Sequence, residues 1–188
     1  MKFPYKHKAE NWFDYAPKKS QEFCKITTKI TKNGYHGVFA LENIPKGRIV
    51  GRTGGVVLSS IDDLPAKYDY PVLIDDGVFL GPEDYDELET LSCLNHSCAA
   101  NVARIGGSIL VAKKNINKSQ ELTIDYASFV AELKPHYRLK GRCGARKCRG
   151  FVDSDDWKKP NIARALWPEW LPFIQKKIMK RGALRKYF

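Results

Sequence analysis

Short apolar or alternating stretches recur along the chain, each bounded by glycine, proline or paired polar residues. Stretches of this length and spacing are typical of short β-strands joined by turns. The pattern therefore predicts a mainly β (α+β) fold. The expected strands are KITTKIT at 25–31, GVFAL at 37–41, RIVG at 48–51, GVVLSS at 55–60, YPVLID at 70–75, VFLGP at 78–82, SILVAKK at 108–114 and ELTIDY at 121–126.

The strongest helical pattern lies near the carboxyl end. Pro172 suits a first helical position, and Ile174 and Ile178 are spaced to share one face. Lys180 lies in the expected last turn, and Gly182 follows as a cap. We therefore predict a short helix between Pro172 and Gly182.

Length and composition indicate one globular domain with short appendages. The 188 residues are 43% hydrophobic and 28% charged, and no apolar run approaches the ~18 residues of a membrane span. The first residues, MKFPYKHKAENWFDY, lack the apolar segment of a secretory signal. We expect a soluble intracellular protein, without distinguishing cytoplasm, nucleus or export to a host cell. In a reducing compartment the five cysteines are expected to be thiols or metal ligands.

Charge is distributed unevenly along the chain. The formal net charge of +11 favours an anionic partner, and nucleic acid is the first candidate. Residues 62–89, however, include ten acidic residues and a single lysine, so the middle is acidic and the ends are basic. The basic stretch 176–186 holds six Lys or Arg and no acid. It fits either a solvated helix face or a contact for the phosphates of nucleic acid.

Four motifs carry the chemistry: GYHGVFALENIPKGRIVG at 34–51, CLNHSCAANV at 93–102, QELTIDYA at 120–127 and RCGARKCRGFV at 142–152. The pairing of NHSC with ELTIDY is specific, whereas the glycine loop alone is weak. From about Lys32 to Val152 the chain resembles the SET-domain family of protein-lysine methyltransferases, with a trailing post-SET segment. The tail SDDWKKPN, followed by WPEWLPFIQKKI, is similar to that of small stand-alone members.

The resemblance implies a SET fold, in which several small sheets surround a knot-like active site and short helices follow. It implies an enzyme that transfers methyl groups from S-adenosylmethionine to lysine amines of a protein, either a histone or another basic protein. The alternative is an inactive SET-fold module that binds nucleic acid or a basic protein tail. The expected divisions are an amino-terminal extension at 1–22, the SET domain at 23–140, the post-SET segment at 141–152 and a basic helical tail at 153–188.

Methyl transfer explains the catalytic residue that the resemblance implies. A free lysine has a pKa of ~10.4, so the site must favour the neutral amine that attacks the methyl group in line. A narrow, dry channel favours it, and a tyrosine hydroxyl with backbone carbonyls can orient the amine. Tyr126 matches the family's catalytic tyrosine. Ile124 matches the position that sets product multiplicity, and because it has no hydroxyl we expect di- or trimethyl-lysine.

The resemblance also implies the cofactor site. Asn95 and His96 match residues that hold S-adenosylmethionine where one segment threads under another, and short polar side chains suit such buried backbone. Gly37 aligns with a glycine loop at the methionine part, although GYHG replaces the usual glycine-x-glycine. The further candidates are Tyr35, His36, Tyr70, which fits a core or edge-strand position equally well, and Phe151 or Trp157 as the aromatic that stacks on adenine.

The cysteines depart from the family pattern. In the family, the NHSC cysteine joins a post-SET C-x-C-x4-C to bind zinc. Cys98, Cys143 and Cys148 match three of these positions, but Gly141 occupies the fourth. The missing ligand of a tetrahedral zinc site could be a histidine, Cys24 or water, and without metal the cysteines would be small buried residues.

Two further expectations concern chemistry outside the cofactor site. A cysteine nucleophile at Cys98 assisted by His96 is a weaker alternative, because residues two apart rarely present that geometry. The acidic segment occupies the place where SET domains carry the insert that walls the substrate groove. It is either a solvated loop or a surface that attracts a substrate lysine flanked by basic residues.

Overall fold

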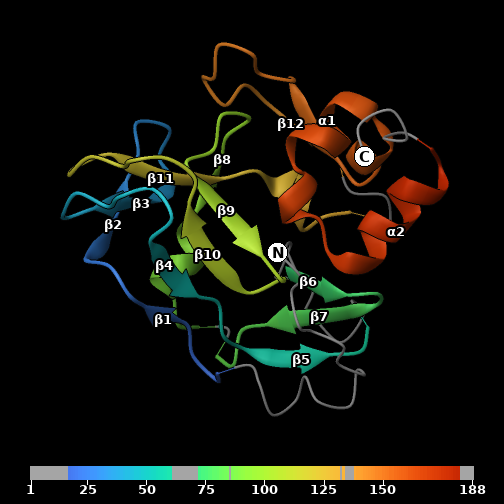
Figure 1. Cartoon of the computed structure of the whole chain (residues 1–188). Helices are drawn as coiled ribbons and strands as arrows, with labels where there is room; N and C mark the ends of the chain where they lie inside the picture. The colour runs from blue at the N-terminus through green and yellow to red at the C-terminus, as the bar shows by residue number, and fades with distance from the viewer. Residues whose placement is uncertain (1–16, 61–71, 85, 132, 134–137, 183–188) are drawn as a thin grey trace.

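The computed structural model describes residues 17–60, 72–84, 86–131, 133 and 138–182 (Figure 1). This part of the chain is mainly β, as predicted, and each of the eight expected stretches contains a strand. The pattern left some of the described strands unpredicted, because they are short or lack a clear alternation: β1 (Gln21–Glu22), β8 (Asn95–His96), β9 (Val102–Ile105), β12 (Arg138–Lys140) and β13 (Phe151–Asp153). No described helix is long and apolar enough to cross a membrane.

The described strands form four small sheets. Two of them have four strands each, one has three and one has two. In their order within each sheet, the strands are β1 (Gln21–Glu22), β4 (Ile49–Arg52), β10 (Ile109–Ala112) and β9 (Val102–Ile105); β2 (Ile26–Ile30), β3 (His36–Ala40), β11 (Glu121–Ile124) and β8 (Asn95–His96); β5 (Val56–Leu58), β7 (Val78–Gly81) and β6 (Val72–Asp75); and β12 (Arg138–Lys140) and β13 (Phe151–Asp153).

One hydrophobic core joins the two larger sheets. Alternation along the strands turns Val38, Val50, Leu110 and Leu122 inward, and each is 0% exposed. Antiparallel pairing sets most of this register, with β10 between β4 and β9 and β3 between β2 and β11. The sheet of β5, β6 and β7 lies to one side of this core (Figure 1).

The carboxyl-terminal helices belong to the same core. The predicted helix is confirmed as α2 (Pro172–Lys180), with Ile174 and Ile178 both 0% exposed and Gly182 at a positive φ of 69°. A second helix, α1 (Pro160–Ala165), buries Ile162 against the same cluster. Among the described residues, short 3₁₀ helices connect the elements: η3 (Thr90–Cys93), η4 (Tyr126–Ser128), η5 (Asp156–Lys158) and η6 (Trp167–Glu169). Residues 154–182 therefore pack as part of the globule (Figure 1).

Candidate active site

The NHSC and ELTIDY segments lie side by side. β8 pairs in parallel with β11, so Asn95 is opposite Thr123 and His96 is opposite Ile124. Beyond β8, the Ser97 N–H donates to the Ile124 carbonyl oxygen at 2.9 Å. Parallel neighbours require a long crossover connection, which here contains β9 and β10. The crossover brings both motifs to one place in the fold.

A buried asparagine fastens β11 in this position. The Asn101 amide donates to the Glu121 carbonyl oxygen at 2.7 Å, and its Oδ1 accepts the Thr123 N–H at 2.8 Å. Asn101 is 3% exposed, so its removal would leave buried backbone groups unpaired. Our sequence reasoning missed this residue. The signal that could have found it is a polar side chain within the otherwise apolar AANVA stretch.

Tyr126 joins the two motif segments. It begins η4, where the Asp125 side chain caps the turn by accepting the Ala127 N–H. Its hydroxyl donates to the Leu94 carbonyl oxygen at 2.8 Å, and its backbone N–H donates to His96 Nδ1 at 3.3 Å. The predicted catalytic tyrosine is therefore in direct contact with a predicted cofactor residue.

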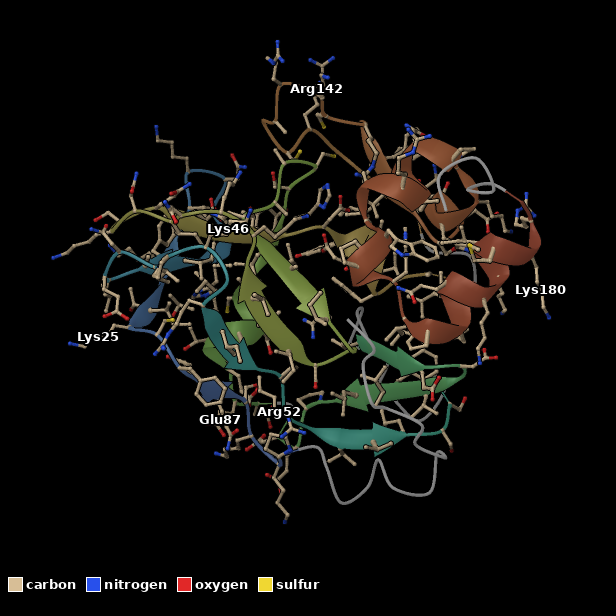
Figure 2. All side chains as sticks on the ribbon, viewed as in Figure 1. Lys25, Lys46, Arg52, Glu87, Arg142 and Lys180 are labelled. Atoms are coloured by element: carbon tan, nitrogen blue, oxygen red, sulfur yellow. The ribbon has the colours of Figure 1, made fainter. Side chains whose placement is uncertain are left out.

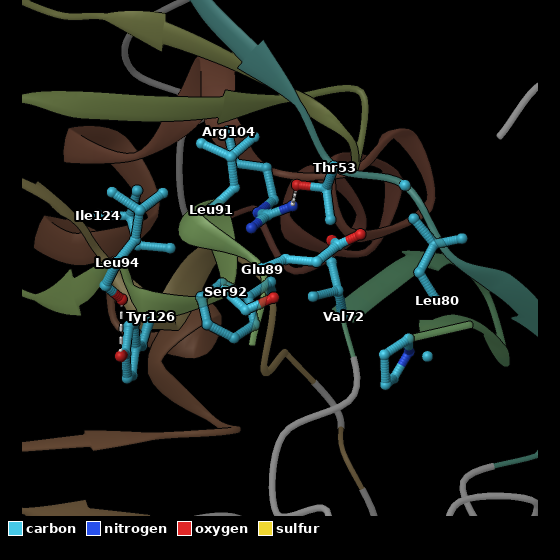
Figure 3. Close-up of a pocket in the computed structure, with 14 residues that line it drawn as sticks. Thr53, Val72, Leu80, Glu89, Leu91, Ser92, Leu94, Arg104, Ile124 and Tyr126 are labelled. Carbon is cyan, nitrogen blue, oxygen red and sulfur yellow. Dashed lines mark hydrogen bonds between the residues drawn. The ribbon is translucent and has the colours of Figure 1, made fainter. Parts of the chain in front are cut away.

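A pocket of about 270 Å³ opens beside Tyr126 (Figure 3). Its wall includes Leu94, Ile124, Thr53 and Arg104, from elements that are distant in sequence. None of the predicted cofactor residues that the structure describes lines this pocket. Tyr126 thus lies between the pocket and His96. This arrangement can separate an acceptor from a cofactor while letting both approach one hydroxyl.

Asn95 connects β8 to the glycine loop. Its Nδ2 donates to the His36 carbonyl oxygen at 3.0 Å and to Glu121 Oε1 at 2.9 Å. A Cβ atom on Gly37 would lie 3.0 Å from this nitrogen and 2.8 Å from Glu121 Oε1. Only glycine therefore lets the loop approach Asn95 closely. Tyr35, which precedes His36, is 71% exposed, so this edge of the site faces solvent.

The aromatic candidates for adenine stacking behave differently from one another. Trp157 is 4% exposed and belongs to the hydrophobic core, so little of its ring is open to adenine. Phe151 is half-buried in β13, with Arg138 and Lys159 within 4.6 Å of its ring centroid. Tyr70 lies outside the described residues. Among the described aromatics of this set, Phe151 is the better placed.

Arg149 ties the post-SET segment to the strand that precedes Tyr126. Its guanidinium donates two hydrogen bonds of 2.7 Å to the buried Asp125 carboxylate. This bidentate geometry fixes the guanidinium plane relative to the carboxylate plane. Burial alone would lower the pKa of Arg149, but the paired Asp125 raises it. Burial also lowers the pKa of His96, and the nearby Asp125 only partly offsets this effect. His96 is therefore neutral near pH 7.

Three cysteines gather at the junction of NHSC and the post-SET segment. Cys98 and Cys143 lie with His96 in a group whose ligand atoms are all within 4.8 Å of one another. The Cys148 thiol interacts with both other thiols, and a backbone N–H from Gly150 lowers its pKa to about 7. Each of the three sulfurs accepts a backbone N–H, with distances of 3.3 or 3.4 Å. Such donors favour thiolates, so the cysteines fit a metal site.

His96 does not suit the fourth ligand position. The Tyr126 N–H at Nδ1 favours the neutral tautomer with its proton on Nε2, which lies 3.3 Å from Cys98 Sγ. In that tautomer Nε2 donates to sulfur and has no free lone pair for a metal. Cys24 is also unsuitable, since it is buried elsewhere and its thiol donates to the Ile49 carbonyl oxygen.

The proximity of His96 and Cys98 bears on the cysteine-nucleophile alternative. Residues two apart rarely present the geometry of a nucleophile and its base, but here His96 Nε2 lies 3.3 Å from Cys98 Sγ. The chemistry is nevertheless unfavourable. Burial raises the pKa of Cys98 to about 12, so the thiolate needed for attack is scarce without a metal.

Comparison with known proteins agrees with this geometry. A family model described as SET domain matches residues 35–127, which span the glycine loop, the NHSC segment and Tyr126. The chain is a SET-domain protein. The matched residues include both motif segments, which meet where β8 pairs with β11.

Relatives of the SET domain include named histone methyltransferases. A protein of Arabidopsis thaliana named Histone H3-lysine(4) N-trimethyltransferase ATX1 is 31% identical over an alignment of 143 residues that covers 66% of this chain and 13% of that protein. A Saccharomyces cerevisiae protein named Histone-lysine N-methyltransferase, H3 lysine-4 specific is 36% identical over 64 residues, or 32% of this chain and 6% of that protein. The chain thus spans only a small part of these curated relatives.

Solved structures share the fold. The methyltransferase domain of human SETMAR has a TM-score of 0.52 and 25% identity, covering 70% of this chain and 58% of that chain. KRYPTONITE in complex with mCHG DNA and SAH has a TM-score of 0.53 and 25% identity, covering 69% of this chain and 29% of that chain. These likenesses confirm the predicted SET fold.

Proposed function

We propose that this chain transfers methyl groups from S-adenosylmethionine to the lysine side chain of a protein. The observation that carries the proposal is the position of Tyr126, which lines the pocket and whose backbone N–H donates to His96. The relatives' names and the SAH in the KRYPTONITE structure support the same reaction class. Mass spectrometry of proteins incubated with labelled cofactor would test the proposal.

The residues around Tyr126 supply the chemistry that transfer needs. S-adenosylmethionine supplies an electrophilic methyl group when it is bound. Gly37, Asn95 and His96 would hold it on the side of Tyr126 away from the pocket. On the pocket side, Leu94 and Ile124 provide apolar surface that disfavours a protonated amine. The Tyr126 hydroxyl would orient the neutral amine for in-line attack, so no strong base is required.

Ile124 bears on how many methyl groups are added. The side chain is 3% exposed, lines the pocket and has no hydroxyl that could restrain a methylated amine. We therefore propose that the enzyme forms di- or trimethyl-lysine.

The acidic segment supports a substrate lysine with basic neighbours, in a histone or another basic protein. Glu83 and Asp84 are exposed just after Leu80 and Gly81 of β7, which line the pocket, and Asp76 is exposed in the turn at the other end of β7. We call these three residues and the exposed Glu87 the acidic rim. Carboxylates at the rim would raise the local concentration of a basic peptide, and salt would screen them. Changing Asp76 and Asp84 to Asn should raise KM for a basic peptide and flatten its salt dependence. An unchanged KM would count against this role.

Some acidic groups of this rim are already engaged. Lys18 pairs with Glu83 at 3.3 Å, and Lys19 pairs with Glu87 at 2.6 Å. A basic peptide would therefore compete with the amino-terminal lysines for Glu83. Asp76 and Asp84 are the cleaner positions for the test.

The basic carboxyl-terminal surface supports a nucleic-acid contact in addition to catalysis. Arg142, in the post-SET segment, and Lys180, at the end of α2, both point outward at separate edges of the molecule (Figure 2). Lys176 and Arg181 are also exposed on or next to α2. Such cations contact phosphate without reading sequence, so binding should fall steeply with salt in a mobility-shift assay. Salt-insensitive or absent binding would contradict this role.

The post-SET cysteines support a structural zinc ion. Cys98, Cys143 and Cys148 would hold it as thiolates, and water or a group outside the described residues would complete the site. The ion would fix the loop of residues 143–148 against the NHSC segment. The residues that follow, including Phe151, would then be held near the cofactor site.

A further inference from the structure

Arg104 is a buried cation in the wall of the pocket. It lies on β9 and is 4% exposed. Its Nη1 donates to Thr53 Oγ1 at 2.9 Å and to the Gly107 carbonyl oxygen at 3.1 Å. Its buried Nε has no hydrogen-bond partner. The guanidinium is therefore held in place, but its hydrogen-bonding capacity is only partly used.

No carboxylate of the described residues lies within 4.0 Å of this guanidinium to form an ion pair. Burial accordingly lowers the pKa of Arg104 to about 10. Phe129 offers only its ring face, with the Arg104 Cζ 5.4 Å from the ring centroid. Burying a charge without a counter-ion is costly, so an unpaired arginine here is unusual for a purely structural position.

The acidic residues near Arg104 are engaged elsewhere. Glu89 lines the same pocket, but its two oxygens accept hydrogen bonds from the Ser20 N–H and the Ser20 hydroxyl. Glu169 interacts with the backbone of Arg104 and pairs with Lys113. Figure 3 shows Arg104 beside Thr53, on the wall of the cavity that also contains Tyr126. The cavity offers a cation with no counter-ion in the described chain.

We propose that Arg104 and Thr53 form a carboxylate-binding subsite in the acceptor pocket. Its ligand would be an Asp or Glu side chain of the substrate polypeptide, close in sequence to the target lysine. This inference rests on the proposed methyltransferase function and adds a specificity determinant to it. The subsite lies on the pocket wall, so it acts at a different flanking position from the acidic rim that attracts basic residues.

The first test needs no activity. Acetate is titrated into the protein while NMR follows the side-chain Nε–H signal of Arg104, assigned by its loss in Arg104→Lys, with sodium chloride as the control. A saturable shift with acetate that chloride does not reproduce is expected. An equal response to both salts would overturn the subsite, even if the protein methylates lysine.

The second test measures kcat/KM for lysine peptides that carry Glu or Gln at each of several flanking positions. At one position Glu should exceed Gln by roughly tenfold, the usual size of a charge-assisted hydrogen bond. Arg104→Met should reduce that ratio below about twofold, and Arg104→Lys should keep part of it. Absence of methylation with any peptide would refute the proposed function, while the acetate titration would still decide the subsite.

Thermal unfolding separates a recognition role from a structural one. Removing an unpaired buried charge costs little stability when an apolar group of similar length replaces it. Arg104→Met should therefore keep its melting temperature within a few degrees of the wild type and lose the Glu preference. A large fall in melting temperature with the Glu preference intact would overturn the proposal.

Discussion

The Tyr126 hydroxyl donates a 2.8 Å hydrogen bond to the Leu94 carbonyl oxygen, and both residues line the pocket. This bond joins η4 to the residue directly before the NHSC motif. It places two oxygen atoms where an incoming amine could donate its hydrogens. A neutral amine held in this way needs only alignment with the methyl group, which is the main contribution of an active site without a strong base.

Gly37→Ala should weaken cofactor binding by about tenfold or more, because its Cβ would meet Thr31, Glu121 and Asn95 at 3.0 Å or less. Calorimetry with S-adenosylmethionine measures the change. Gly106→Ala is the comparison variant, since nothing lies within 4 Å of the added Cβ there; its φ of 57° is positive, unlike that of Gly37, so its strain should affect stability and leave cofactor affinity unchanged. Equal affinities for the wild type and Gly37→Ala would show that the glycine loop has no part in the site.

Ile124→Tyr should shift the products toward monomethyl-lysine, because a hydroxyl at this buried pocket position would restrain rotation of a methylated amine. Ile124→Phe is the control, because phenylalanine is nearly as large as tyrosine but has no hydroxyl, and this variant should still allow di- or trimethylation. The mass distribution of the product peptide distinguishes the two. A wild-type enzyme that stops at one methyl group, with no change in Ile124→Tyr, would contradict this role.

Purified protein should contain about one zinc ion per chain, measurable by elemental mass spectrometry. Cys143→Ser should lose the ion because it removes one of three thiolates. His96→Gln should retain it, because His96 Nδ1 accepts the Tyr126 N–H and Nε2 carries the proton. Metal-free wild type would rule out the structural zinc, and zinc loss in His96→Gln alone would make His96 a ligand.

The Lys113–Glu169 pair should give stability a pH dependence. Burial raises the pKa of Glu169 above its ordinary 4.5, although Lys113 opposes the shift. The Glu169 carboxyl therefore ionises at lower pH in the unfolded chain than in the folded protein. The free energy of unfolding consequently falls as pH rises from 4.5 through the pKa that Glu169 has in the folded protein. Glu169→Gln should remove this slope and change stability at pH 7 by only about 1 kcal/mol.

Lys113→Met is the matched comparison for this pair. It leaves the buried Glu169 without its cation, so it should lower the free energy of unfolding at pH 7 more than Glu169→Gln does. The expected loss is only about 2 kcal/mol, because Lys113 is itself only partly buried. Denaturant unfolding at several pH values measures both variants. The account would be wrong if Glu169→Gln were the more destabilised of the two at pH 7.

The sequence predicted those strands and helices whose pattern of apolar and polar residues is visible within a few consecutive residues. Alternation identified β2, β3 and β11, and the spacing of Ile174 and Ile178 with the Gly182 cap identified α2. It could not identify β8, because this two-residue strand exists only through its pairing with β11. β9 was also missed, since three of its four residues are buried and the stretch does not alternate.

The same distinction applies to the site. Tyr126, Asn95, His96 and Gly37 were predicted from motifs, and the structure brings them together around β8 and β11. The burial of Trp157 could not be predicted, because it depends on how the carboxyl-terminal helices pack on the core.

The most distant contacts were the least predictable. Arg104 is a pocket residue only because β9 places it against Thr53, fifty-one positions away in sequence. Nothing in the local sequence NVARI indicates a cation in an acceptor pocket. Contacts of this kind are set by tertiary packing rather than by local pattern.

The most direct test of the central claim compares Tyr126→Phe with the wild type in transfer of a labelled methyl group from S-adenosylmethionine to a basic lysine-containing protein, followed by mass spectrometry. The hydroxyl acts at the transfer step, so the variant should bind cofactor within a few-fold of the wild type and lose most of its turnover, about a hundredfold or more. Melting temperatures should match within a few degrees, since the ring remains packed against Phe129. Methylation of lysine by the wild type and its near-absence in Tyr126→Phe is the predicted result. Equal turnover by the two proteins, or no methylation of any lysine by the wild type, would contradict the account.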